Sequence, residues 1–204
     1  MTVNGRALEL QRGINLEYGG LAYNVLEAAV GVAAGVAAGS VALVGFGLDA
    51  VVESASAVVL ILRFRSERTG TRSSQEAEAR AIRLVAAAFV LLALYVGVTA
   101  VVQLARGAQA ETSAIGIGLA CLSLIVMPYL AYRKTALAKD LGSRSLRADS
   151  RQTILCTYLS AILLIGLLAN ALLGWWWADP VAALAIAAIA LREAQELWSE
   201  KDLG

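Results

Sequence analysis

The sequence contains no histidine and only two cysteines among its 204 residues. The absence of histidine removes the commonest transition-metal ligand and the commonest proton acceptor near neutral pH. Cys121 and Cys156 both lie in long apolar runs, where we expect buried thiols or a metal ligand instead of a disulfide framework. Metal or proton chemistry in this chain would therefore rest on carboxylates, amides or a thiol.

Charged residues are absent from four long stretches of the chain. They make up 16% of the residues, whereas hydrophobic residues make up 59%, more than is usual for a soluble domain. The uncharged stretches are residues 28–48, 84–105, 112–132 and 152–178. About 20 apolar residues span a bilayer. The sequence therefore predicts one integral membrane domain, with no room for a second folded domain and with no signal-peptide cleavage site.

The apolar runs and short turns predict an all-α membrane protein, a six-transmembrane-helix bundle. We expect the spans at residues 18–38, 40–62, 82–105, 112–132, 148–172 and 176–194. The expected organisation is an N-terminal segment (1–17), the six-helix domain (18–196) and a short tail (197–204). Consecutive helices joined by short turns form antiparallel hairpins.

The basic residues predict the orientation of this bundle. Every Lys and Arg except Arg106 lies near one of the two termini or in residues 63–83 and 133–151, which include the predicted connections 63–81 and 133–147. Six spans place all of these segments on one side of the membrane. The positive-inside rule then puts both termini in the cytoplasm.

Two acids interrupt the second apolar run. Asp49 and Glu53 are four residues apart, so both carboxylates leave one face of a helix about one turn apart. Each costs about 2.5–3.5 kcal/mol in the centre of a bilayer. We expect no Lys or Arg at the same depth, which makes a divalent cation the natural partner and the chain a candidate ion carrier. The alternative is a pair of acids hydrogen-bonded to neighbouring helices without a ligand.

The fifth run offers a second pair at the same spacing. Gln152 supplies a neutral carbonyl oxygen and Cys156 a potential thiolate. On composition alone this signal is weak, because a buried cysteine is usually a small hydrophobic residue.

Three segments resemble the cation diffusion facilitator (cation efflux) family. GSVALVGFGLDAVVES resembles its second helix, LRADSRQT its fifth-helix segment and DPVAALAIA the start of its sixth helix. The resemblance implies a metal site formed by Asp49, Glu53, Gln152 and Cys156, where the family has Asp or His, Asp, His and Asp. It covers about residues 14–196, so the family's cytoplasmic metal-sensing, dimerising domain is expected to be absent.

The resemblance implies a transporter, not an enzyme, with no prosthetic group. We expect export of a divalent transition metal, first Zn²⁺, by alternating access in exchange for protons, since protonation of carboxylates and thiols releases metal. The expected setting is lipid, the inner membrane of a bacterium, with a homodimer formed through membrane helices and no nucleic-acid partner. The alternatives are Cd²⁺, Fe²⁺, Mn²⁺ or Cu⁺ as substrate, or a metal-binding membrane regulatory protein that does not transport.

Three further polar residues belong to this prediction. Asn24 and Glu27, three residues apart on the first helix, would line the access path or support the ligands; the alternative is an inter-helix hydrogen bond with a protonated Glu27. Asp149 would guide cations in from the cytoplasm, or would simply be an acid favoured at a helix start.

Two structural patterns complete the prediction. Asp179 and Pro180 are expected as N-cap and first residue of the last helix. Gly31, Gly35 and Gly39 form a stripe of small residues that would serve either the core of the monomer or a dimer contact.

Overall fold

The fold is a bundle of long helices. The computed structural model describes residues 3–68 and 75–199, and these residues contain helices but no strand. The helices are α1 (Val3–Ala38), α2 (Val41–Arg68), α3 (Gln75–Arg106), α4 (Ala114–Leu141), α5 (Arg144–Leu173) and α6 (Ala178–Ser199). The prediction of an all-α, six-helix bundle is confirmed. The predicted tail lies partly outside the described residues.

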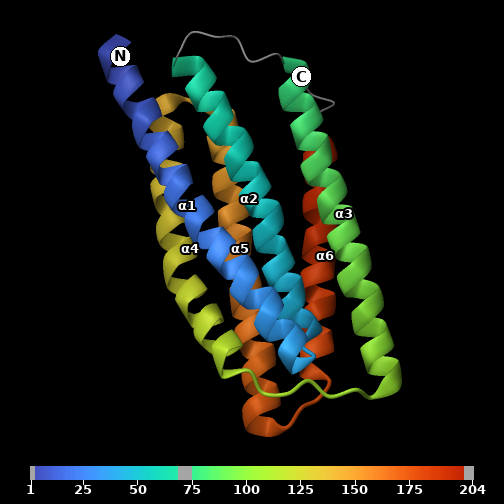
Figure 1. Cartoon of the computed structure of the whole chain (residues 1–204). Helices are drawn as coiled ribbons and strands as arrows, with labels where there is room; N and C mark the ends of the chain where they lie inside the picture. Colours follow the sequence, from blue (N-terminus) through green and yellow to red (C-terminus); the bar gives the residue numbers. More distant parts are fainter. Residues whose placement is uncertain (1–2, 69–74, 200–204) are drawn as a thin grey trace.

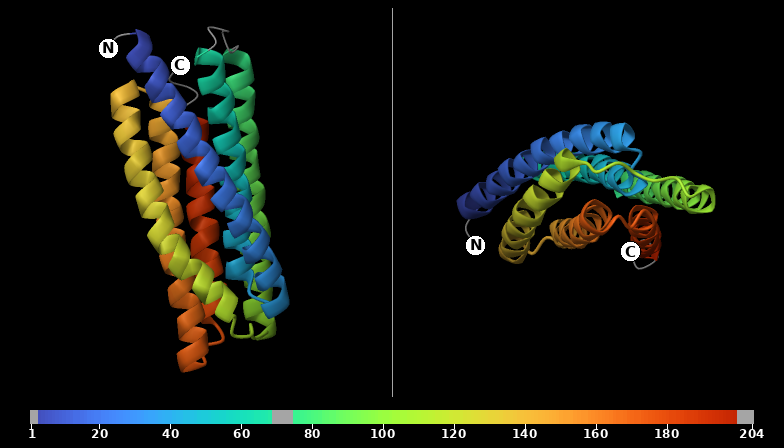
Figure 2. Two further views of the ribbon diagram at one scale, coloured as in Figure 1. Left: turned by 60° about the vertical axis from the view of Figure 1, so that its left-hand side comes forward. Right: turned by 90° about the horizontal axis from the view of Figure 1, so that it is seen from below.

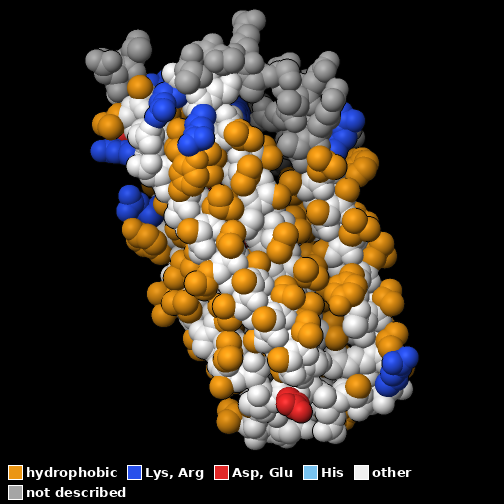
Figure 3. Space-filling view, viewed as in Figure 1, with side chains coloured by type: hydrophobic (Ala, Val, Ile, Leu, Met, Phe, Trp, Pro, Cys, Tyr) orange, Lys and Arg blue, Asp and Glu red, His pale blue; other side chains and the backbone are white. Residues whose placement is uncertain are grey.

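Five of the helices, α1 to α5, are long and apolar enough to cross a membrane. α6 does not qualify, because its 22 residues include Asp179, Arg192, Glu193 and Glu196. It still runs antiparallel to α5 beside the other helices (Figure 1). Hydrophobic side chains cover the length of the face shown in Figure 3, and Lys and Arg gather mainly at one end. The chain is an integral membrane protein.

The helices extend past the predicted spans at the end that carries the basic residues. α1 begins at Val3, within the predicted N-terminal segment, and α2 continues to Arg68. The predicted connection 133–147 is wrong, because α4 and α5 are separated only by Gly142 and Ser143. Gly142 ends α4 at φ +63°, and the Ser143 hydroxyl accepts a hydrogen bond from an amide of α5. Charge marks where a bilayer core ends, and a helix is free to continue beyond that point.

α2 lies at the centre of the bundle. It packs against α1, α3, α5 and α6, while α1 also packs on α4 (Figures 1 and 2). α3 pairs with α6, and α4 pairs with α5. α1 begins and α6 ends at the same end of the bundle, where the α4–α5 turn also lies. The α1–α2, α3–α4 and α5–α6 turns lie at the opposite end, as the sequence predicts.

Glycines bring α1 and α2 into backbone contact. A Cβ on Gly31 would lie 3.1 Å from the Cα of Gly47, and one on Gly35 would lie 2.6 Å from the amide nitrogen of Val44. Gly31 and Gly35 therefore serve the core of the monomer. Gly39 lies outside the helix, in the turn at φ +66°, so the predicted three-glycine stripe holds for two members only.

Asp179, the second residue of α6, caps the start of α2. Its carboxylate accepts hydrogen bonds from the Ser40 hydroxyl and from the amide of Val41, the latter at 2.9 Å. The Ser40 hydroxyl oxygen in turn accepts from the amide of Leu43 at 3.1 Å. The prediction of Asp179 as N-cap of the last helix is wrong, because α6 already begins at Ala178. The carboxylate instead satisfies the free amides at the start of α2 and ties α6 to it.

Cysteine labelling tests the orientation. In a Cys121→Ala/Cys156→Ala background, we expect Lys139→Cys at the end of α4 and Ala108→Cys in the α3–α4 turn to react from opposite sides of the membrane. Both positions are exposed. An impermeant maleimide added to right-side-out vesicles should label only position 108, and label at both positions in sealed vesicles would contradict the bundle's orientation.

Candidate metal site

The four predicted ligands lie on two packed helices in the interior. Asp49 and Glu53 are on α2, and Gln152 and Cys156 are on α5. All four side chains are buried, with relative exposures of 5%, 2%, 8% and 2% in that order. The spacing of four residues on each helix turns both pairs inward.

A small cavity joins three of the four residues. Asp49, Gln152 and Cys156 line it together with residues of α3 and α6, among them Phe89 and Glu193. Its volume is about 10 Å³, close to the minimum for one water molecule. Glu53 does not line this cavity, although it lies one turn from Asp49 on the same face of α2.

Only one of the two carboxylate oxygens of Glu53 has a hydrogen-bond partner among the described residues. Its Oε1 accepts a hydrogen bond from the Thr153 hydroxyl at 2.9 Å. Its Oε2 has no hydrogen-bond partner within the described residues, and neither has the Nε2 of Gln152. Buried polar atoms without partners are costly. The site therefore has spare ligand capacity for a cation or a proton.

The predicted ligand side chains do not converge on one point where an ion could bind. Across residues 3–68 and 75–199, no three Cys, Asp or Glu side chains are positioned to hold a metal ion. Asp49, Glu53 and Cys156 are neighbours, but an ion would require their side chains to rotate toward one another. The assignment of Asp49, Glu53, Gln152 and Cys156 as ligands stays a prediction.

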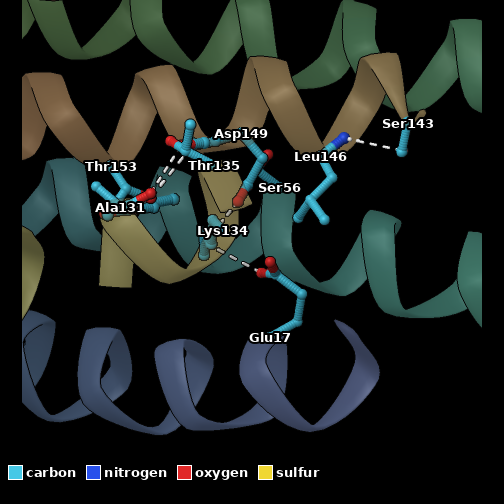
Figure 4. A network of polar contacts seen from close by, with 11 residues as sticks. Glu17, Ser56, Ala131, Lys134, Thr135, Ser143, Leu146, Asp149 and Thr153 are labelled. Carbon is cyan, nitrogen blue, oxygen red and sulfur yellow. Dashed lines mark hydrogen bonds and ion pairs between the residues drawn. The ribbon is translucent and has the colours of Figure 1, made fainter. Parts of the chain in front are cut away.

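A second buried cluster contains residues that sequence reasoning missed. The Lys134 ammonium lies 2.5 Å from Asp149 Oδ2 and 3.1 Å from Glu17 Oε2 (Figure 4). Ser56 donates to Asp149 Oδ1 at 3.2 Å. The expectation that no basic residue reaches this depth is wrong, because the buried Lys134 pairs with Asp149, and the Thr153 hydroxyl that donates to Glu53 also donates to the backbone oxygen of Asp149.

This cluster changes the interpretation of Asp149. Its carboxylate is held in an ion pair and is not free to guide cations in this conformation. It is also not at the helix start, since α5 begins at Arg144. The sequence contains a signal for the two missed residues. Glu17 lies seven residues before Asn24 on the same face of α1, and Lys134 lies seven residues after the buried Met127 on the same face of α4.

Asn24 and Glu27 face the interior from α1. Both are buried, with exposures of 2% and 0%. The Tyr23 hydroxyl donates to Glu27 Oε1 at 3.4 Å, whereas Asn24 Oδ1 and Glu27 Oε2 have no hydrogen-bond partner among the residues described. Their role in an access path stays a prediction.

Glu193 was not predicted, yet it lines the same cavity as Asp49. It lies seven residues after the buried Ile186 and fourteen after Asp179, on the inward face of α6. This spacing was a usable signal. The acid adds a carboxylate from a third helix to the surroundings of Asp49.

Comparison with known proteins identifies the family. The model of the cation efflux transmembrane domain matches residues 20–201. The chain belongs to the cation efflux family. A protein of Synechocystis sp. (strain PCC 6803), described as an uncharacterized transporter, is 29% identical over 153 residues, which are 72% of this chain and 49% of that protein. The chain thus spans about half the length of this relative.

Thr153 provides a test of the geometry around Glu53. We expect Thr153→Val to weaken zinc binding about 10–100-fold, because loss of the hydroxyl frees the Glu53 carboxylate from its supporting hydrogen bond. Isothermal titration calorimetry of the purified protein measures the change.

Thr157→Val is the matched control. The Thr157 hydroxyl donates to the backbone oxygen of Thr153 at 3.3 Å, so its loss should leave binding unchanged. Equal affinities for the Thr153 and Thr157 variants would show that Glu53 needs no such support.

Proposed function

We propose that this protein exports a divalent transition metal, with Zn²⁺ as the first candidate, in exchange for protons. The observation that carries the proposal is the buried group of Asp49, Gln152 and Cys156, which line one small cavity, with Glu53 one turn from Asp49 on α2. Membership of the cation efflux family supports transport of a metal cation. The exchange partner and the choice of metal are supported by the chemistry of the ligands.

The ligand types favour a borderline-soft ion. Zinc accepts thiolate, carboxylate and carbonyl oxygen in a four-coordinate site, and Asp49, Glu53, Gln152 and Cys156 supply these groups. A thiolate shifts the preference from Mn²⁺ toward Zn²⁺ and Cd²⁺. The chain has no histidine, so nitrogen ligation does not compete.

The same groups can exchange metal for protons. Carboxylates and a thiolate bind metal only when deprotonated, so metal binding releases protons and protonation releases metal. In a closed and nearly dry interior, two carboxylates without either cation or proton are strongly disfavoured. The empty carrier therefore returns with protons on its ligands, which couples the two flows.

The packing supports alternating access. α3 and α6 pair with each other and contact the rest of the bundle through α2 and α5, the two helices that carry the predicted ligands. Asp179 fastens α6 to the start of α2 at the end of the bundle away from the termini. Movement of the α3–α6 pair would open the cavity that Asp49 shares with Phe89 and Glu193.

We keep the homodimer as part of the proposal. Gly31 and Gly35 are used within the monomer, so a dimer would have to form through the exposed apolar faces of the helices. Leu84, Leu91 and Leu94 on α3 are examples, with exposures of 72%, 67% and 59%.

Transport by the purified protein in sealed lipid vesicles is the decisive measurement. We expect labelled zinc to accumulate under an opposing proton gradient, and Asp49→Asn and Glu53→Gln to reduce the rate by at least about tenfold, because each removes an anionic ligand. Glu196→Gln, which alters an exposed residue, is the control and should transport like the parent. Zinc binding without transport would indicate a regulatory metal-binding protein instead, and parent-like rates for both acid variants would place the site elsewhere.

Cys156 provides an independent readout of the same site. Bound zinc should protect the buried Cys156 thiol from alkylation, because a coordinated thiolate is no longer available as a nucleophile. The exposed Cys121 serves as an internal control and should react equally with and without zinc. Mass spectrometry after alkylation measures both, and unchanged modification of Cys156 at saturating zinc would remove it from the ligand set.

A further inference from the structure

The buried ion cluster joins four helices. Glu17 comes from α1, Ser56 from α2, Lys134 from α4 and Asp149 from α5. Figure 4 shows the Lys134 ammonium between the two carboxylates, with Ser56 bonded to the other side of Asp149. The two acids and the lysine have side-chain exposures of 0–3%. The cluster is therefore an interior feature of the bundle and not a surface salt bridge.

The cluster is incompletely satisfied. Neither carboxylate oxygen of Glu17 has a hydrogen-bond partner within the described residues, although Oε2 lies 3.1 Å from the ammonium. Moving such ions out of water carries a large desolvation cost, and apolar replacements are often more stable. Two carboxylates and one ammonium also leave one negative charge in excess. Buried carboxylates with unpartnered oxygens are typical of a cation site. In this structure the cation beside them is the Lys134 ammonium.

The cluster lies next to the candidate metal site, toward the end with both termini. Asp149 precedes Gln152 on α5, which starts at that end, and Ser56 follows Glu53 on α2, which finishes there. The Thr153 hydroxyl connects the two sites: it lies 2.9 Å from Glu53 Oε1 and 3.2 Å from the backbone oxygen of Asp149. Along α2 and α5, the cluster therefore lies between Glu53 and the end of the bundle that carries both termini.

We propose that Glu17, Asp149 and Ser56 form a second cation site, which the Lys134 ammonium occupies in this conformation and which a divalent metal ion occupies in its place during transport. This inference rests on the proposed function and adds a step to it. Two carboxylates and a hydroxyl are oxygen ligands that suit a divalent cation. Lysine is suited to the exchange, because its ammonium is a compact charge on a flexible chain that can swing away.

The exchange makes Lys134 a tethered competitor of the substrate. A divalent ion and the ammonium repel each other and bind the same two carboxylates, so only one of them can occupy the cluster at a time. While Lys134 is in place, the cluster is closed to metal. When the ammonium moves, the acids become available and the path toward Glu53 is open.

Removal of the ammonium tests the proposal. Zinc titration calorimetry on the purified full chain should show one bound ion per chain for the parent and two for Lys134→Gln. The added ion should be lost again in Lys134→Gln/Asp149→Asn. It should persist in Lys134→Gln/Asp49→Asn, in which the first site is disabled. Lys134→Arg keeps the charge and is the matched control, with parent stoichiometry.

Two results would overturn the proposal. One is a Lys134→Gln variant that binds the same number of zinc ions as the parent. The other is an added ion that survives Asp149→Asn. In either case a parent that binds and transports zinc leaves the proposed function standing, whereas a parent that neither binds nor transports zinc refutes the proposed function itself.

A folding defect in Lys134→Gln is also informative. Without the ammonium, two buried acids lack a partner, and the variant is expected to be less stable than the parent. Zinc should then raise its thermal unfolding temperature more than it raises that of the parent, because the metal replaces the missing charge. Potassium chloride at the same ionic strength is the control. An equal zinc effect on both proteins, or a variant that zinc does not rescue, would contradict a metal site at the cluster.

Discussion

Several carboxylates lie buried inside this apolar bundle, and their need for a compensating partner governs the structure. Asp49 and Glu53 are carried into the interior by α2, the helix with the most neighbours in the bundle, and water cannot reach them there. A carboxylate in such surroundings needs a hydrogen bond, a cation or a proton. Thr153 satisfies this need only in part, because Glu53 Oε2 has no hydrogen-bond partner among the described residues. The unpartnered Glu53 oxygen is where the proposed site would accept a cation or a proton.

Two structural devices place α2 where it can carry these acids. Gly31, Gly35 and Gly47 allow the backbones of α1 and α2 to touch, which presses the acidic face of α2 toward α5. At the far end, Asp179 of α6 binds the first amides of α2. Asp179 therefore has a structural role. Its carboxylate oxygens accept hydrogen bonds from groups at the start of α2, so it is not available to a metal.

The interior acids thus fall into two groups with different partners. Glu17 and Asp149 share the Lys134 ammonium, whereas Asp49 and Glu53 lie beside a thiol and an amide. In the exchange proposed above, the Lys134 ammonium and a metal ion are alternative partners of the same two carboxylates. The Thr153 hydroxyl lies between the two groups of acids, 2.9 Å from Glu53 Oε1 and 3.2 Å from the backbone oxygen of Asp149.

The sequence by itself determined the helical class, the approximate spans and the inward face of each ligand pair, because long uncharged runs and four-residue spacings act locally. It also placed Asp49 with Glu53 and Gln152 with Cys156, each pair on its own helix. Only the tertiary structure decided which helices meet. It brought Lys134 to Asp149 and Glu17 and turned Asp179 toward α2, since contacts between residues far apart in sequence depend on how whole helices pack. Hydropathy predicted where the apolar runs end and not where the helices end, which is why a lysine assigned to a connection proved to lie in the core.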